Sequence, residues 1–185
     1  MIFSVNKYNV IVTGGSRGIG LALAEGFSSA GANVIILDIN PPEVEGNYNY
    51  INCDLGNQDH IQVVLDRIFS DGFIPKVLIN CAAVTIPAPS HQYSDSDWRR
   101  SISVNLDGVF TLCREVGRIM INSSISGSII NFTSIGAEQG FANNPGYAAT
   151  KGAVKQLTKA LAVEWGEYGI RVNNIVPGYT NTPMN

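Results

Sequence analysis

The sequence predicts a doubly wound α/β fold, with helices on both faces of a mostly parallel sheet in three αβα layers. Three observations predict it. Short apolar runs alternate with segments of helical period, a glycine-rich turn joins the first run to the first helix, and 45% of the residues are hydrophobic while 15% are charged. A chain of 185 residues can bury one sizeable core and is short for two, so we expect residues 1–185 to form a single domain.

Six segments are expected to be strands, because each is a short apolar run bounded by polar or turn residues. They are Asn9–Thr13, Asn33–Asp38, Tyr48–Asn52, Lys76–Asn80, Ser128–Ser134 and Arg171–Val176. Helices are expected between them, most clearly over Asn57–Phe69, whose apolar residues recur at helical spacing. This alternation predicts parallel pairing through right-handed crossovers.

Several classes of protein are disfavoured by composition and by what the motifs lack. The net charge of −3 argues against nucleic-acid binding, and the N-terminal residues show neither a membrane anchor nor a secretory signal, so a cytoplasmic location is expected. Cys53, Cys81 and Cys113 are far apart and have no metal-ligand spacing, so we expect reduced, partly buried thiols and no metal site. His60 and His91 are interpreted as surface or helix-start residues.

The first glycine-rich turn has the form of a phosphate-binding loop. Gly14, Gly18 and Gly20 lie between the first strand and the first helix, where the absence of side chains lets a pyrophosphate approach the helix N-terminus. The same glycines could serve only a tight turn. Asp38 favours the first interpretation, because it ends the second strand eighteen residues after Gly20, where a carboxylate can accept hydrogen bonds from a ribose.

Taken together, the motifs of the chain resemble those of the short-chain dehydrogenase/reductase family, over nearly its whole length. They occur in the family's order, and their combination is specific although no single one is. The motifs are Thr13-Gly14-Gly15-Ser16-Arg17-Gly18-Ile19-Gly20, Asp54-Leu55, Asn80-Cys81-Ala82-Ala83, Asn105, Ser134, Tyr147-Ala148-Ala149-Thr150-Lys151 and Pro177-Gly178. One departure is Cys81-Ala82-Ala83, where the family more often has Asn-Ala-Gly.

This resemblance implies a Rossmann-like domain that binds a nicotinamide dinucleotide. Asp54 and Leu55 would border the adenine, Asn80 would support the strand beside the cofactor, and the residues after Pro177 would touch the nicotinamide. The full set of expected cofactor-binding residues is Gly14, Ser16, Arg17, Gly18, Ile19, Gly20, Asp38, Asp54, Leu55, Asn80, Ala82, Tyr147, Lys151, Pro177, Gly178, Thr180 and Thr182.

NAD is the expected cofactor and NADP the less favoured one. The carboxylate of Asp38 should accept from an unmodified ribose and repel a 2′-phosphate. Arg17 favours NADP, because family members that use NADP often carry a basic residue in the glycine loop; the alternative is a solvated, exposed arginine.

Tyr147 and Lys151 have the spacing of an acid–base pair. They are four residues apart on a helix expected to begin near Pro145, so they share one face. A free tyrosine has a pKa of about 10, and a nearby cation favours its phenolate. By resemblance Ser134 holds the substrate oxygen, although at a strand end it could also serve as a cap or turn residue.

Asn105 occupies a gap in an apolar stripe. In the helical segment after Ser94, apolar residues recur in steps of three and four, at Trp98, Ile102, Val109, Leu112, Val116 and Ile119. A core-facing amide needs partners, so Asn105 either caps a neighbouring loop or joins a polar network. The resemblance favours the network, in which a helix distortion frees a carbonyl for a water that leads to the lysine. The predicted catalytic residues are thus Asn105, Ser134, Tyr147 and Lys151.

The reaction implied is hydride transfer between nicotinamide and a secondary alcohol or carbonyl. The segments expected to face the substrate, Thr85–Asp97 and Ile135–Asn144, are loops without a diagnostic signature. The polarity of the second, with Glu138, Gln139, Asn143 and Asn144, favours a sugar, polyol or similar small compound. A ketoacyl-carrier reductase, or a dinucleotide-binding protein without turnover, are the alternatives.

The C-terminal end is where the chain departs most from the family. Family members usually continue past Pro177-Gly178 into a lid, a further helix and a last strand, so we expect the domain to be C-terminally incomplete at Asn185. By the same resemblance, the surface of the Trp98–Ile119 and Tyr147–Trp165 helices would remain available for pairing. A homodimer is therefore expected, and a tetramer if the chain is longer.

Overall fold

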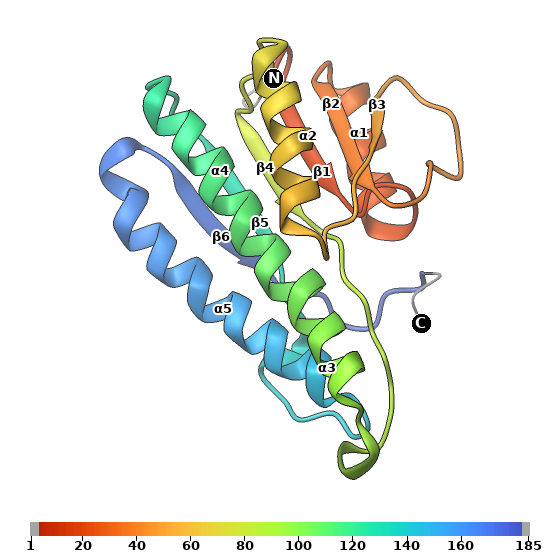
Figure 1. Ribbon diagram of the computed structural model, residues 1–185. Coiled ribbons are helices and arrows are strands. Elements are labelled where there is room, and N and C mark those ends of the chain that lie inside the picture. The colour runs from red at the N-terminus through yellow and green to blue at the C-terminus, as the bar shows by residue number, and fades with distance from the viewer. Residues whose placement is uncertain (1–3, 183–185) are drawn as a thin grey trace.

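Six parallel strands form one sheet in the order β3-β2-β1-β4-β5-β6 (Figure 1). The computed structural model describes residues 4–182. The strands are β1 (Asn9–Thr13), β2 (Asn33–Asp38), β3 (Asn49–Asn52), β4 (Val77–Asn80), β5 (Ser128–Phe132) and β6 (Arg171–Ile175). All six predicted strands are present, and the predicted doubly wound fold class is confirmed.

Four strands are shorter at one end than the sequence predicts, and β5 shows the physical reason most clearly. It ends at Phe132, not at Ser134. The Ser134 hydroxyl accepts a hydrogen bond from the Gly136 N–H at 3.1 Å and caps the 3₁₀ turn η3 (Ile135–Ala137). The Thr133 N–H still donates to the Ile175 carbonyl at 2.9 Å, and regular pairing with β6 gives way to this turn.

Helices separate the strands as expected, except that the chain passes from β2 to β3 without one. They are α1 (Gly18–Ser29), α2 (Gln58–Ser70), α3 (Asp95–Ile102), α4 (Gly108–Asn122) and α5 (Pro145–Trp165), with 3₁₀ turns η1 (Ser90–Gln92) and η4 (Gly166–Tyr168). Local capping sets two of the starts: Asn57 accepts from the His60 N–H and Ser94 from the Asp97 N–H, each at 3.0 Å. The substrate-side loop therefore ends at Ser94, three residues before its predicted end.

Alternating side chains of the strands build a core on each face of the sheet. Ile11, Leu78 and Ile129 pack with α2, α4 and α5 on one face, whereas Val12 and Ile36 pack with α1 on the other. Both faces bury apolar side chains, so the central strands are apolar along their length. Within residues 4–182, none of the helices is both long and apolar enough to cross a bilayer.

The strand order reverses between β1 and β4. The chain runs outward from β1 to β2 and β3, then returns to place β4 against the other side of β1. In doubly wound sheets the loops diverge at such a point and leave a crevice at the carboxyl ends of the strands. The glycine turn after β1 and the Cys81-Ala82-Ala83 segment after β4 meet there.

A π turn, η2 (Ser103–Asp107), joins α3 to α4. The extra residue in this turn changes which side chains face the core, so the predicted apolar stripe is partly wrong: Trp98 is 42% exposed, whereas Ser101 is fully buried. Asn105 lies inside the π turn and is fully buried, as its place in the stripe predicts.

Gly20 offers a stability prediction with a control on the same helix. A Cβ at Gly20 would lie 2.1 Å from the Gly14 carbonyl oxygen, whereas a Cβ at Gly26 would meet nothing within 4 Å. We expect Gly20→Ala to lower the free energy of unfolding by about 1–3 kcal/mol. Gly26→Ala should raise it by about 0.5–1 kcal/mol, because alanine restricts the unfolded chain more than glycine does. Urea denaturation of both variants checks this, and equal stabilisation by the two would contradict it.

Candidate active site

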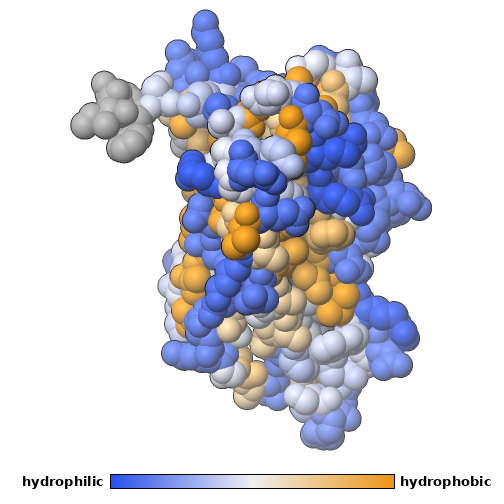
Figure 2. Space-filling view, turned by 90° about the vertical axis from the view of Figure 1, so that its left-hand side faces the viewer, coloured by the Kyte–Doolittle hydropathy of each residue, from blue (hydrophilic) through white to orange (hydrophobic). Residues whose placement is uncertain are grey.

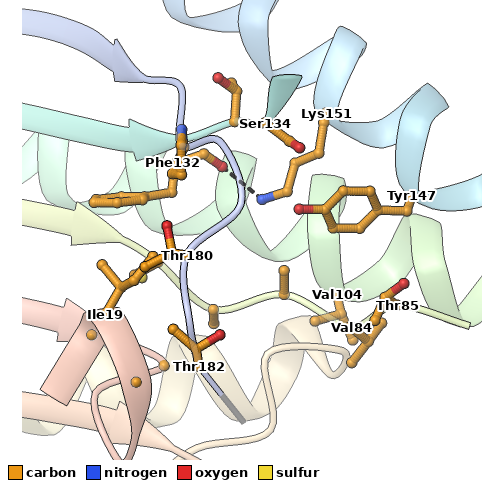
Figure 3. A pocket seen from close by; sticks show the side chains of 18 of the residues that line it. Ile19, Val84, Thr85, Val104, Phe132, Ser134, Tyr147, Lys151, Thr180 and Thr182 are labelled. Carbon is orange, nitrogen blue, oxygen red and sulfur yellow. Dashed lines mark hydrogen bonds between the residues drawn. The ribbon is translucent and has the colours of Figure 1, made fainter. Parts of the chain in front are cut away.

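A cavity of about 560 Å³ lies at the carboxyl edge of the sheet, and most of the predicted site residues line it (Figure 3). Those lining it are Gly14, Arg17, Gly18, Ile19, Gly20, Asp38, Asp54, Leu55, Ala82, Ser134, Tyr147, Lys151, Pro177, Gly178, Thr180 and Thr182. Three predicted residues, Ser16, Asn80 and Asn105, lie behind this lining. The structure therefore gathers segments from both halves of the sheet around one pocket.

The glycine turn is shaped by close packing of backbone on backbone. Gly14 has φ +65° and Gly18 has φ +56°, a region that side chains disfavour. A Cβ at Gly14 would lie 2.6 Å from the Cα of Ala82, so the turn packs directly against the segment after β4. Arg17 precedes α1 without a side-chain cap, and the first turn of α1 holds no acidic residue. The N–H groups at this helix end therefore suit a phosphate.

Asp38 is held at the end of β2 by two backbone donors. Its carboxylate accepts from the Ser16 N–H at 3.2 Å and from the Asn40 N–H at 3.1 Å. The Ser16 hydroxyl donates to the Asn40 carbonyl. Ser16 thus fixes the position of Asp38 in the pocket wall and does not itself line the pocket, while the Arg17 side chain is exposed at the rim.

Arg100 is a site residue that sequence reasoning missed. Its Nη1 lies 3.4 Å from Oδ1 of Asp54, and the Gly56 N–H donates to the same oxygen at 2.9 Å. Both Arg100 and Asp54 line the pocket. The link joins α3 to the segment predicted to border an adenine, and no local signal reveals it because the two residues are 46 positions apart.

Ser134 and Tyr147 lie together on one wall of the pocket. Burial is the largest influence on the phenol pKa of Tyr147 and raises it above the ordinary value of 10. A hydrogen bond with the Ser134 hydroxyl lowers this pKa, and Cys81 raises it. The pKa of this phenol is therefore raised overall, contrary to the lowering expected from Lys151.

Lys151 is buried on α5 beside the Tyr147 ring. Its Nζ donates to the Phe132 carbonyl at 2.6 Å, and it lies 5.5 Å from the centroid of the Tyr147 ring. The ammonium is thus anchored to the end of β5. Burial lowers the pKa of Lys151 to about 8, an effect partly opposed by Cys81. The amine remains mostly protonated at pH 7.

The side chain of Asn105 binds a loop. Its Nδ2 donates to the Val84 carbonyl at 2.9 Å and its Oδ1 accepts from the Val84 N–H at 2.8 Å. A weaker contact of 3.3 Å reaches the Thr150 hydroxyl. Loop capping, one of the two alternatives for this residue, is therefore present. The helix distortion that the resemblance implies is present too, as the π turn η2.

Asn80 belongs to a row of amides across three strands, of which Asn80 and Asn131 are buried. Asn80, Asn131 and Asn174 are aligned in register on β4, β5 and β6. The Asn80 amide donates to Asn131, the Asn131 amide to Thr158, and the Thr158 hydroxyl to Asn174, each at 2.8 Å. Asn80 thus supports the central strands from behind the pocket. Asn131 and Asn174 could have been noticed in the sequence because each is a polar residue within a predicted apolar strand.

The opposite wall comes from the chain after β6. Figure 3 shows Thr180 and Thr182 on the side of Ile19, across the pocket from Tyr147. The ring of Tyr179 lies 6.5 Å from that of Phe141 between centroids, so this segment approaches the loop that follows Ser134. Phe141 and Tyr179 both line the pocket; they were not named as site residues, although they lie in segments predicted to face the substrate and the nicotinamide.

The thiols follow the expectation that they are unpaired. All three cysteines are free: Cys53 and Cys113 are buried, and Cys81 is half-buried in the pocket wall. Burial raises the thiol pKa of Cys81 to about 11, although Lys151 lowers it somewhat. At neutral pH this thiol is protonated.

Several known proteins that are similar to this chain in sequence and fold are named as dehydrogenases. The "2-dehydro-3-deoxy-D-gluconate 5-dehydrogenase" of Pseudoalteromonas atlantica is 37% identical over 193 residues, covering 97% of this chain and 75% of the relative. The "3beta-hydroxysteroid dehydrogenase 1" of Eggerthella lenta is 34% identical over 188 residues, 95% of this chain and 72% of the relative. A solved structure of "4-hydroxyisoleucine dehydrogenase complexed with NADH" superposes with a TM-score of 0.92 at 33% identity, covering 96% of this chain and 78% of that one.

The family model described as "short chain dehydrogenase" matches residues 8–185. This match agrees with the parallel sheet, the glycine turn and the pocket where the strand order reverses. The chain therefore belongs to the short-chain dehydrogenase/reductase family of NAD(P)-dependent oxidoreductases.

Proposed function

We propose that this protein transfers hydride between nicotinamide and a secondary alcohol or carbonyl of a small polar compound such as a sugar acid or polyol. The observation that carries the proposal is the meeting of Ser134, Tyr147 and Lys151 in one pocket with the glycine turn and Asp38. A dinucleotide fits this lining, because the open N-terminal end of α1 suits its phosphates and Asp38 suits a ribose. When bound, the nicotinamide accepts or donates the hydride.

The side chains divide the remaining work. In the oxidation direction Tyr147 takes the proton of the substrate hydroxyl, and Ser134 hydrogen-bonds the substrate oxygen. Lys151 supplies positive charge beside the phenol and can reach a ribose hydroxyl. Asn105 holds Val84 and thereby the loop on the substrate side. Reduction uses the same groups in the reverse order.

The substrate class follows from polar loops and from relatives, and it needs a direct test. The relative from Pseudoalteromonas acts on a sugar acid, as its name says, while that from Eggerthella acts on a steroid. With NAD supplied, NADH absorbance should rise with 2-dehydro-3-deoxy-D-gluconate or threitol, and little with a 3β-hydroxysteroid. With NADH supplied, its absorbance should fall little with a ketoacyl carrier. Fast turnover of the steroid or the ketoacyl carrier alone would contradict the proposed class. Dinucleotide binding without any turnover would favour a binding protein.

NAD is proposed as the preferred cofactor. Asp38 would place a negative charge beside a 2′-phosphate, whereas the exposed Arg17 would attract it. Because the carboxylate is fixed by two N–H donors, we expect NADH to bind at least about tenfold more tightly than NADPH. Asp38→Ala should lower the ratio of the NADPH to the NADH dissociation constant, and Arg17→Ala should raise it. Fluorescence titration measures both, and tighter binding of NADPH by the unmodified protein would overturn the preference.

We further propose a cytoplasmic homodimer formed through α4 and α5. Phe110 on α4 is 42% exposed and Val163 on α5 is 86% exposed. Figure 2 shows the side of the molecule on which α5 and β6 lie in Figure 1, where apolar residues form a band among hydrophilic ones. Burying such residues favours association. Sedimentation equilibrium tests the dimer, and a monomeric mass at micromolar concentration would contradict it.

A further inference from the structure

Arg100 on α3 is a basic side chain of the pocket wall that the proposed reaction does not use. Its Nη1 lies 3.4 Å from Oδ1 of Asp54, and both residues line the pocket. The Arg100 side chain is 41% exposed and that of Asp54 is 42% exposed, so a ligand in the pocket can reach both. An ion pair at this exposure contributes little to stability. Its effect is therefore expected on what the Asp54 carboxylate can bind.

Gly56 gives the Arg100 guanidinium its place beside Asp54. A Cβ at Gly56 would collide with Nη1 of Arg100 and would lie 3.2 Å from Oδ1 of Asp54. Because glycine has no Cβ, the guanidinium can lie over the segment that follows β3. The Gly56 N–H donates to the same Oδ1 at 2.9 Å. Oδ1 thus has a charged donor and a backbone donor, which come from two parts of the chain.

These two donors leave one oxygen of Asp54 available. Its Oδ2 makes no hydrogen bond with residues 4–182, whereas Oδ1 makes both bonds given above. A carboxylate accepts hydrogen bonds and donates none. Because Oδ1 is held by two donors, rotation of the carboxylate about its last side-chain bond is restricted. Asp54 therefore presents one acceptor in a fixed direction.

Apolar side chains lie next to this acceptor. Leu55 follows Asp54 in the chain, and Val104 lies beside Gly56, where an added Cβ would be 3.1 Å from Val104 Cγ2. Leu55 and Val104 both line the pocket, and Figure 3 labels Val104 there. A flat ring with an amino group at its edge suits this place, because its faces can meet aliphatic side chains while its N–H meets a carboxylate. A 6-aminopurine has this chemistry.

We infer that Arg100 is a positioning residue, which holds Asp54 so that Oδ2 accepts from the 6-amino group of the cofactor's adenine. The inference rests on the proposed function, which puts a dinucleotide in this pocket, and it adds a selection among purines. Hypoxanthine carries a carbonyl oxygen where adenine carries the amino group, so two acceptors would face each other without a proton between them. Arg100 and Gly56 thus make the pocket discriminate against 6-oxopurines.

Titration with two matched dinucleotides tests this role. NADH and reduced nicotinamide hypoxanthine dinucleotide differ only in the purine, and fluorescence gives the dissociation constant of each. The unmodified protein should bind NADH about tenfold more tightly. Arg100→Gln should reduce this preference to about threefold, and Arg100→Lys, which keeps a charged donor, should recover most of it. A loss of fold stability alone would weaken the binding of both dinucleotides equally and leave the ratio unchanged.

Arg99 supplies a control on the same helix. It pairs with Asp95 at 3.7 Å, and the two side chains are 76% and 91% exposed, so Arg99→Gln should leave the ratio of dissociation constants unchanged. Asp54→Ala should remove the preference for NADH. Adding Arg100→Gln to Asp54→Ala should change the ratio no further, because Arg100 acts through Asp54.

The outcomes separate this inference from the proposed reaction. Equal affinity of the unmodified protein for the two dinucleotides, or a preference that Arg100→Gln leaves unchanged, would overturn the role of Arg100. Hydride transfer is scored separately, by NADH formation from NAD and threitol. Absence of that transfer would count against the proposed reaction while the binding ratio still decides the role of Arg100. Failure of both dinucleotides to bind would overturn the two together.

Discussion

Tyr147→Phe should lower kcat by about 10²–10⁴-fold, the range over which a positioned acid–base group contributes. The change removes the phenol oxygen and keeps the ring, which packs half-buried beside Lys151. Because the proposed contacts of the dinucleotide lie mainly with the glycine turn, Asp38 and Lys151, its dissociation constant should change by less than about threefold. Steady-state kinetics and NADH titration on the same preparation give both numbers.

Tyr168→Phe is a suitable control for that experiment. Tyr168 is 47% exposed in η4, outside the pocket lining, so the same chemical change there should leave kcat within about twofold. If Tyr147→Phe retained full kcat, or lost cofactor binding as severely as turnover, the proton-transfer role assigned to Tyr147 would be wrong.

Lys151→Met should damage both turnover and cofactor binding. Methionine fills a similar volume but removes the ammonium, so the charge beside the phenol and the donor for a ribose are lost together. We expect kcat/KM to fall by about 10²-fold or more and the NADH dissociation constant to rise by about tenfold. An unchanged dissociation constant would contradict the ribose contact, and unchanged kcat/KM would contradict both roles.

The same variant should alter how stability depends on pH. Burial lowers the folded-state pKa of Lys151 to about 8, whereas its ordinary value is 10.5. Between these values the unfolded chain binds more protons at this residue, so its contribution makes the fold more stable as pH rises from 8 to 10.5. Buried thiols such as Cys113, with its pKa raised to about 12, act in the opposite direction. As pH rises from 8 to 10.5, the Tm of the unmodified protein should therefore rise relative to the Tm of Lys151→Met. A difference in Tm that stays constant over this range would contradict a buried amine with a lowered pKa.

Local sequence patterns were sufficient to locate the strands and to predict which residues line the pocket. The apolar runs locate all six strands, and the i, i+4 relation of Tyr147 and Lys151 places both in the pocket. Asp38 was recognisable because it ends a strand at a fixed distance from the glycine turn. Strand ends were less accurate, since the cap formed by Ser134 depends on one hydrogen bond in a turn.

Contacts between distant segments could not be predicted in this way. Thr85 and Asn144 are 59 residues apart, and only the approach of two loops pairs them. The exposed position of Trp98 follows from the π turn, whose extra residue no simple helical period anticipates. The pKa of Tyr147 likewise depends first on its burial, which spacing alone does not contain.

Transfer of a label from substrate carbon to cofactor tests the central claim most directly. The protein is incubated with NAD and with threitol that carries deuterium on its secondary carbinol carbons, and the reduced cofactor is analysed by mass spectrometry. The account predicts one deuterium in the NADH formed by the unmodified protein and strongly reduced formation by Tyr147→Phe. NAD that binds to the unmodified protein but gains no deuterium, from threitol or from an equally labelled sugar acid, would contradict it.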